Sequence, residues 1–159
     1  MNDKIPCGGL IERHDLCLVE VLGVDWQPEV SCGILGKFAG KGIALSYLSL
    51  GNGPDGRKNM SFCVNTEKLA ANRALLAEIE RDFSPRKVEV RAPVVILTLY
   101  GPHFNERPAL ASQVFAALCM DGIQPQTVCS SINSISAVIE TLDRDRAVQC
   151  LEQKFSWPD

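Results

Sequence analysis

The sequence contains an internal repeat, in which a block near residue 34 reappears 80 positions later. Residues 34–43 (ILGKFAGKGI) align with residues 114–123 (VFAALCMDGI). Further along, residues 60–64 align with residues 135–139 at an offset of 75, so the first copy carries five extra residues between its two matched blocks. Self-similarity of this kind is typical of a duplicated structural unit, and it limits the possible folds more than any single motif does.

Both copies begin with a strand followed by a helix. A β-rich run covers residues 17–22 in the first copy and residues 94–99 in the second. A helix is predicted to start near Pro28 and near Pro108, because proline is favoured in a first helical turn. Apolar residues then recur at the three-to-four spacing of an amphipathic helix.

The second half of each copy predicts a hairpin and another helix. Gly42 and Gly122 stand where a helix C-terminus needs the left-handed backbone conformation. The hairpins are predicted at residues 43–50 with 59–64 and at residues 127–130 with 134–140. The last helices are expected to be capped by Asn65 and Thr66 in the first copy and by Thr141 and Asp143 in the second.

This order predicts an α+β fold made of two ferredoxin-like βαββαβ units packed together. Residues 87–90 can supply the fourth strand of the first copy, but only residues 156–159 follow the last helix of the second. We therefore expect residues 9–13 to complete the second unit with an N-terminal strand. The predicted domains are an N-terminal segment at 1–15, a first unit at 16–91 and a second unit at 92–159.

Composition argues against nucleic-acid and membrane partners. The chain has 16 Lys and Arg against 19 Asp and Glu, a net charge of −3, which offers no basic surface for phosphates. The longest uncharged apolar run, residues 92–100, is far too short for a membrane span. The N-terminus leads into no apolar stretch of the kind found in secretory signals. A cytoplasmic protein is expected.

Cysteine and histidine spacing predicts no metal site, no cofactor and no catalytic centre. The seven cysteines lie at least ten positions apart, so no C-x-x-C motif exists, and most have apolar neighbours typical of small buried thiols. The two histidines, His14 and His103, have no local nucleophilic partner.

Two loops imitate phosphate-binding motifs. Residues 51–56 match G-x-G-x-x-G literally, but the loop leads into a strand, whereas a dinucleotide site needs a helix there. We interpret it as a hairpin loop. Residues 130–134 form a hydroxyl cluster that suits either a phosphate or a polar bend between two strands, and the bend is the simpler interpretation.

The loops that lead into the first helix of each copy have the best functional chemistry. Residues 25–30 and 105–110 both end at a predicted helix N-terminus, where free backbone amides attract a carboxylate. Asp25 or Glu106 could accept the ammonium group of the same ligand. An α-amino acid carries both charges, so these loops suit it, although two ordinary polar loops would look the same.

Three stretches resemble a known family. Residues 107–123 (RPALASQVFAALCMDGI) are similar to its pattern h-P-G-v-a-a-k-x-F-x-a-L-a-x-x-g-I. Residues 129–139 are similar to its S-T-S-x-x-x-I-S-v-v-v, and residues 145–155 to its A-V-x-x-L-h-x-x-F. The family is that of ACT domains, and the chain resembles in particular the tandem ACT regulatory region of aspartokinases. In that region a segment similar to residues 9–15 supplies a strand to the second ACT unit.

The resemblance implies a non-catalytic regulatory module that binds a small amino acid where ACT units meet, forms a homodimer and lacks the kinase part. Glu29 and Ala109 replace the glycine that usually follows the loop proline, and the family's I-N-V-D reads as residues 43–46 (IALS) here. The positions that the loops and the resemblance indicate for ligand binding are Asp25, Gln27, Pro28, Glu29, Val30, Ala44, Ser46, Arg107, Pro108, Ala109, Leu110, Gln124 and Gln126.

Two other functions fit the same fold order. A protein-interaction subunit with a degenerate ligand site could control an enzyme of amino-acid metabolism in trans, and the substituted contact positions favour it. An RNA-recognition fold also has βαββαβ order, but it stacks bases on aromatic residues of its central strands. Here residues 60–64 offer only Phe62 and residues 135–139 offer none, so RNA binding is disfavoured.

Overall fold

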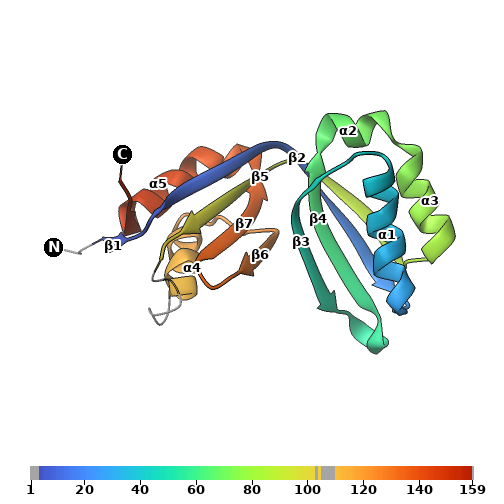
Figure 1. Cartoon of the computed structure of the whole chain (residues 1–159). Helices are drawn as coiled ribbons and strands as arrows, with labels where there is room; N and C mark the ends of the chain where they lie inside the picture. Colours follow the sequence, from blue (N-terminus) through green and yellow to red (C-terminus); the bar gives the residue numbers. More distant parts are fainter. Residues whose placement is uncertain (1–3, 103, 105–109, 159) are drawn as a thin grey trace. The chain divides into compact units, whose positions relative to one another are not determined.

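The computed structural model describes residues 4–102, 104 and 110–158, which divide into two compact units (Figure 1). The first unit is Asp15–Pro93, and the second combines Met1–His14 with Val94–Asp159. The chain therefore crosses from one unit to the other twice, once within each of its two longest strands. The predicted fold class, with two ferredoxin-like units and an N-terminal strand in the second, is confirmed.

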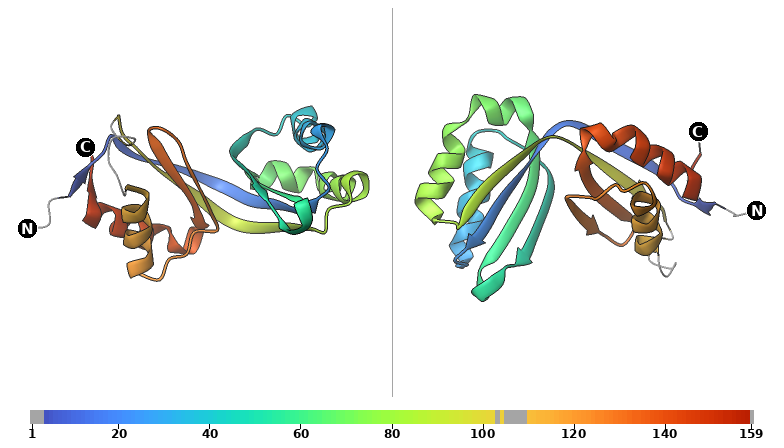
Figure 2. Two further views of the ribbon diagram at one scale, coloured as in Figure 1. Left: turned by 90° about the horizontal axis from the view of Figure 1, so that it is seen from below. Right: turned by 180° about the vertical axis from the view of Figure 1, so that it is seen from behind.

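The first unit has one helical layer over one sheet. Its sheet order is β3-β4-β2-β5, and α1 and α3 cover one face (Figure 2). The core on that face includes Ile34, Phe38, Phe62 and Ile79, and the rings of Phe38 and Phe62 meet edge to face with centroids 4.8 Å apart. The elements are β2 (Gly9–Val24), α1 (Pro28–Gly40), β3 (Leu45–Asn52), η1 (Pro54–Gly56), β4 (Lys58–Asn65), α2 (Thr66–Ala71), α3 (Ala74–Phe83) and β5 (Lys87–Tyr100).

The second unit repeats this plan with the order β2-β5-β7-β6. Its core includes Leu97, Val114, Leu118, Ile139 and Leu151, so helices again cover one face of the sheet. A separate two-stranded pair, which the sequence did not predict, joins β1 and β8 in parallel. The elements beyond the shared strands are β1 (Ile5–Pro6), α4 (Leu110–Met120), β6 (Thr127–Ser130), β7 (Ser134–Glu140), η3 (Thr141–Asp143), α5 (Arg144–Lys154) and β8 (Phe155–Ser156).

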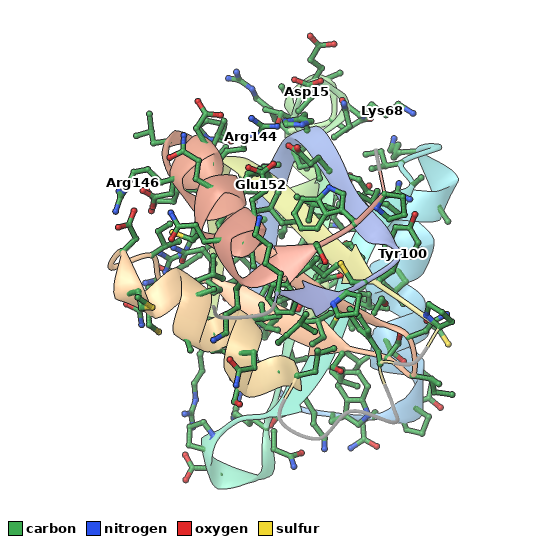
Figure 3. The ribbon with its side chains drawn as sticks, turned by 90° about the vertical axis from the view of Figure 1, so that its left-hand side faces the viewer. Asp15, Lys68, Tyr100, Arg144, Arg146 and Glu152 are labelled. Carbon is green, nitrogen blue, oxygen red and sulfur yellow. The ribbon has the colours of Figure 1, made fainter. Side chains whose placement is uncertain are left out.

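The N-terminal segment is fixed to the second unit by backbone and side-chain bonds. The Gly8 amide donates to the Tyr100 carbonyl at 2.7 Å. A Cβ on Gly9 would lie 2.7 Å from the Tyr100 hydroxyl, so the strand passes the ring closely only because it has no side chain there. Farther along β2, the Glu12 carboxylate accepts from Nε of Arg144 at 2.7 Å and, through its other oxygen, from Nη2. Figure 3 labels Arg144 at the start of α5.

Both copies close their first helix with the same C-terminal motif. Gly42 and Gly122 have φ of 67° and 70°, as predicted. The amide of Ile43 donates to the Phe38 carbonyl, and that of Ile123 to the carbonyl five residues before it, both at 3.0 Å. These are the hydrogen bonds of a Schellman motif, and the isoleucine that follows each glycine is buried.

Two local predictions need correction. The single helix expected after β4 is two helices, since the chain turns at Asn72 between α2 and α3. Asn65 does cap α2, accepting from the Lys68 amide at 3.0 Å, but Asp143 makes no capping bond to α5. Its carboxylate instead accepts from Arg146 at 2.9 Å, a side-chain partner that competes with capping.

We expect Glu12→Gln to lower the free energy of unfolding by about 1 kcal/mol, because it replaces a bidentate charged contact at a partly solvated site. That corresponds to about 2–4 °C in Tm. The exposed Glu80→Gln, which lies past the first turn of α3, is the matched control and should leave Tm unchanged.

The effect of Glu12→Gln should also depend on pH. Hydrogen bonds from Arg144 are the largest cause that holds the pKa of Glu12 below its usual 4.5. A lowered folded-state pKa stabilises the fold fully above the unfolded value and less as pH falls through the folded one. The difference between the two proteins in denaturant titrations should therefore be full at pH 7 and shrink below about 4.5. If the difference in the free energy of unfolding between the two proteins stays the same in acid, the stabilising role of the Glu12 carboxylate is contradicted.

Candidate functional site

The loop between β2 and α1 leaves the start of a helix open. Gln27 occupies the N-cap position of α1 but makes no side-chain capping bond, and Pro28 follows in the first turn. Trp26 packs against the first core and anchors the loop, while Asp25 and Gln27 are exposed. Pro28 has no N–H, and the Val30 amide already donates to the Gln27 carbonyl at 3.0 Å. The Glu29 amide is the first-turn donor that remains available to an anionic group.

Side chains from the β3–β4 hairpin meet this loop. Arg57 approaches Asp25 at 3.2 Å and donates to the Gly23 carbonyl at 2.9 Å. Asn59 accepts from the Gly23 amide through its Oδ1 at 2.8 Å. Gly23 has φ of 67° beside a register shift in β2, so both of its peptide groups point to the hairpin.

A second ion pair lies at the same end of the unit. Arg86, which follows α3, binds Asp55 of η1 at 2.7 Å, and its backbone amide donates to the Gly23 carbonyl at 3.4 Å. The hydrogen bond from Arg86 is the largest cause that lowers the pKa of Asp55. We call Asp25, Asp55, Arg57 and Arg86 the first-unit charge cluster. It offers two carboxylates and two guanidinium groups beside the start of α1.

The other predicted positions of the first loop have different surroundings. Glu29 is exposed in the first turn of α1, where a negative charge stabilises the helix but repels a ligand carboxylate. The side chain of Val30 is half-buried against the first core. It therefore contributes to packing and offers no polar group to a ligand.

Ala44 and Ser46 lie at the opposite end of the first unit. They follow the C-terminal end of α1, and its 13 residues span about 20 Å at 1.5 Å per residue. Within this unit the structure does not bring them near Asp25 or Gln27. A single small ligand cannot reach both ends of α1 in one unit.

The predicted positions of the second unit are also spread out. Arg107, Pro108 and Ala109 lie outside the described residues. Leu110 is buried in the second core, with 6% of its surface exposed. Gln124 and Gln126 follow the other end of α4, and the Gln126 amide donates to a β7 carbonyl at 2.8 Å.

Both phosphate-like loops are hairpin bends, as predicted. Residues 51–56 connect β3 to β4 through η1 and open no longer helix. In the β6–β7 bend the hydroxyls of Ser131 and Ser134 bond to each other at 2.8 Å. Neither loop presents a cradle of amides at a helix start.

The cysteines are free thiols in unlike surroundings. Cys63 is buried, and burial is the largest cause that raises its pKa to about 12. Cys17 is buried as well, but Cys32 and Cys119 are exposed on α1 and α4, so the expectation of small buried thiols holds for Cys17 and Cys63 and is wrong for these two. Within residues 4–102, 104 and 110–158 no group of His, Cys, Asp and Glu is arranged to hold a metal ion. No helix in that part of the chain is long and apolar enough to cross a membrane.

Comparison with known proteins agrees with this architecture. Residues 97–155 match the model of the ACT domain family. The chain is 24% identical over 92% of its length to an aspartate kinase of Pseudomonas fluorescens (strain SBW25), and 26% identical over 98% to aspartokinase 2 of Bacillus subtilis (strain 168). It spans 36% and 38% of those two proteins.

Solved structures show the same fold over nearly the whole chain. The ligand-free regulatory subunit of aspartate kinase from Thermus thermophilus aligns with a TM-score of 0.83 and 19% identity, covering 94% of this chain and 99% of that one. Aspartate kinase from Synechocystis aligns with a TM-score of 0.87 and 19% identity, covering 96% of this chain and 28% of that one. The resemblance to the regulatory region of aspartokinases is confirmed.

Gly23→Ala should lower the free energy of unfolding by about 1–2 kcal/mol, because a side chain disfavours positive φ. A Cβ there would also lie 2.8 Å from the Arg86 side chain and displace it from the cluster. Gly36→Ala is the matched control. It lies inside α1 with nothing within 4 Å of its Cβ position, and should stabilise by about 0.5–1 kcal/mol. Urea denaturation measures the free energy of unfolding of both variants. A change of the same sign in both would refute the role of the positive φ at Gly23.

Proposed function

We propose that this chain, which carries an ACT domain at residues 97–155 and has the fold of aspartokinase regulatory subunits, is a non-catalytic regulatory module that binds a small amino acid. The proposal includes a homodimer, with amino-acid sites where ACT units meet. It also assigns the chain to the cytoplasm, where the amino-acid biosynthetic enzymes that such a module would regulate work.

The observation that carries the proposal is the first-unit charge cluster beside the uncapped start of α1. The α-carboxylate of an amino acid would accept from the Glu29 amide at the start of α1 and from Arg57, a pairing that helix ends and guanidinium groups both favour. The α-ammonium would bind the Asp25 carboxylate, which is 76% exposed and reachable from solvent.

Regulation would follow from the segments that the cluster joins. Asp25 precedes α1, Arg57 follows the hairpin turn, and Arg86 precedes β5. A ligand bound to two of these segments favours the conformation in which they lie together, and so shifts the population of conformations of the first unit. The substituted positions Glu29 and Ala44 mean that specificity for lysine or threonine is not carried over from aspartokinases.

A thermal-shift screen against the twenty amino acids tests this function. A ligand at about 100 times its Kd should add about 2.7 kcal/mol, or about 5–10 °C in Tm. We expect a shift from one or two amino acids only. Asp25→Asn should then weaken binding about fivefold in calorimetry, because it removes one partly solvated charge pair.

The control for Asp25→Asn is Glu67→Gln, which removes one exposed carboxylate from α2 in the same unit. It should leave affinity unchanged. Equal loss of affinity in both variants would indicate a general charge effect and contradict the assigned role of Asp25. If none of the twenty amino acids raises the Tm, the proposal that the chain binds a small amino acid is rejected.

A second candidate is a subunit that regulates an enzyme of amino-acid metabolism in trans with a degenerate ligand site. The specific observation in its favour is that Asp25 is already paired with Arg57, so a ligand ammonium must compete for it. One solved structure in the same fold group contains aspartokinase α and β subunits. Sedimentation of this chain with the aspartokinase catalytic chain of its own organism tests the idea, and separate boundaries at micromolar concentration would reject it.

A further inference from the structure

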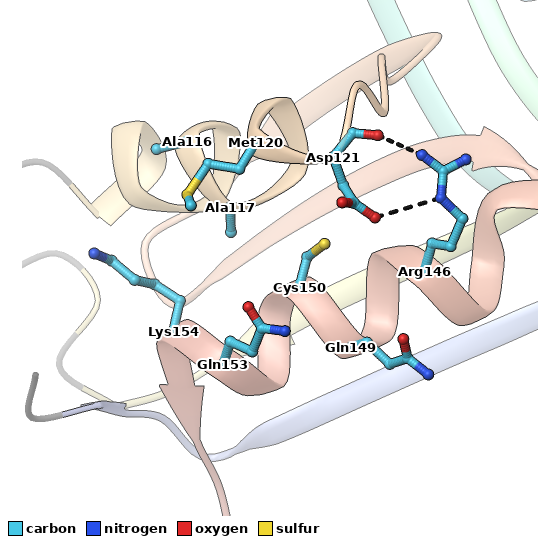
Figure 4. A pocket seen from close by; sticks show the side chains of 9 residues that line it. All are labelled: Ala116, Ala117, Met120, Asp121, Arg146, Gln149, Cys150, Gln153 and Lys154. Carbon is cyan, nitrogen blue, oxygen red and sulfur yellow. Dashed lines mark hydrogen bonds and ion pairs between the residues drawn. The ribbon is translucent and has the colours of Figure 1, made fainter.

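A groove lies between α4 and α5 of the second unit, and none of its lining residues is among the predicted ligand-binding positions. Its volume is about 400 Å³, within the range of small-molecule sites. Figure 4 shows its lining, which comes from both helices and from the turn after α4. The groove belongs to one unit only, so it does not depend on how ACT units meet.

One end of the groove is electrostatically neutralised. Arg146 donates from Nε to the Asp121 carboxylate at 3.4 Å, from Nη2 to the Asp121 carbonyl and from Nη1 to Asp143 at 2.9 Å. Cys150 lies beside the same carboxylate, and burial followed by that negative charge raises the pKa of its thiol. The thiol therefore stays protonated at neutral pH. This end offers a ligand no unpaired charge.

The other end carries the positive charge of Lys154. Lys154 closes α5, eight residues after Arg146, so the two lie about 12 Å apart along the helix. The structure records no ion pair for Lys154 with any residue of 4–102, 104 or 110–158. A carboxylate at this end would gain a partner without displacing an existing one.

The middle of the groove is apolar on one wall and amide-bearing on the other. Met120 and Ala116 stand one turn apart on α4, and Met120 has 87% of its surface exposed. Gln149 and Gln153 stand one turn apart on α5 and offer amide donors and acceptors. The flexible thioether of a methionine adapts to apolar chains of varied shape.

We propose that the α4–α5 groove binds a small carboxylate with an unbranched apolar chain. Its carboxylate contacts the Lys154 ammonium, its chain lies against Met120 and Ala116, and the amides of Gln149 and Gln153 flank it. Lys154 and Arg146 are separated by about 12 Å along α5, which leaves room for a chain of about six carbon atoms before the Asp121–Arg146 pair. This site differs from the first-unit charge cluster in unit, chemistry and ligand class.

The test probe is hexanoate. It is titrated into the whole chain until the shifts saturate, and binding is monitored by ¹H–¹⁵N and methyl ¹H–¹³C NMR spectra. We expect saturable shifts confined to the side-chain amides of Gln149 and Gln153, the methyl of Met120 and their neighbours. Hexylammonium, which has the same chain and the opposite charge, should produce none of them.

Lys154→Gln should weaken hexanoate binding at least fivefold, with Lys68→Gln on α2 of the first unit as the matched control that leaves it unchanged. Both lysines lie at the surface of a helix, so unchanged spectra elsewhere will report that each variant folds. Three results would each overturn the site. They are an equal response to hexylammonium, an unchanged hexanoate affinity in Lys154→Gln, and chemical shifts that spread over both units without saturation.

The Asp25→Asn variant separates this site from the proposed amino-acid site. It should bind hexanoate as the unaltered chain does, because Asp25 belongs to the other unit. Loss of hexanoate binding in that variant would overturn the independence of the groove. A flat amino-acid screen together with saturable hexanoate shifts would reject the proposed function and support the groove.

Discussion

Two long strands each serve two folding units, and the rest of the architecture depends on this sharing. β2 places Gly9–His14 in the second unit and Asp15–Val24 in the first, while β5 contributes Lys87–Pro93 to the first and Val94–Tyr100 to the second. The strands of each unit therefore include residues from both shared strands of the six-stranded sheet. The Glu12–Arg144 contact and the β1–β8 pair fix the N-terminal segment, so the second unit combines the two extremes of the chain.

In the first unit, the residues that stabilise the fold and the charged loop residues lie at opposite ends of the first helix. The C-terminal end of the first helix is closed by a glycine with positive φ and a buried isoleucine, identical in both copies. In the first unit the opposite end collects Asp25, Arg57 and their neighbours around Gly23. Charge is tolerated there because the cluster is partly solvated and every guanidinium has a carboxylate or carbonyl partner. Loops that change without unfolding the sheet are suited to carry ligand contacts.

The charge cluster and the α4–α5 groove offer two different recognition chemistries. The cluster presents both signs of charge beside an open helix start, which suits a zwitterion. The groove presents the Lys154 ammonium, an apolar wall and a neutralised far end, which suits a chain with a single carboxylate. A module with both could report on two metabolites, since each site lies within a separate unit and neither uses the residues of the other.

The sequence by itself determined the duplicated βαββαβ order, both hairpins, Gly42 and Gly122, and the need for an N-terminal strand. These follow from periodicity and backbone preference, which neighbouring residues encode. It also located the Asp25 loop, but it did not find Arg57 or Arg86, the break at Asn72, the β1–β8 pair or the groove beside Lys154. Asp25 and Arg57 stand 32 positions apart, and Glu12 and Arg144 stand 132 apart. Only the tertiary structure decided such pairings, because a side-chain contact depends on where loops from separate elements end in space.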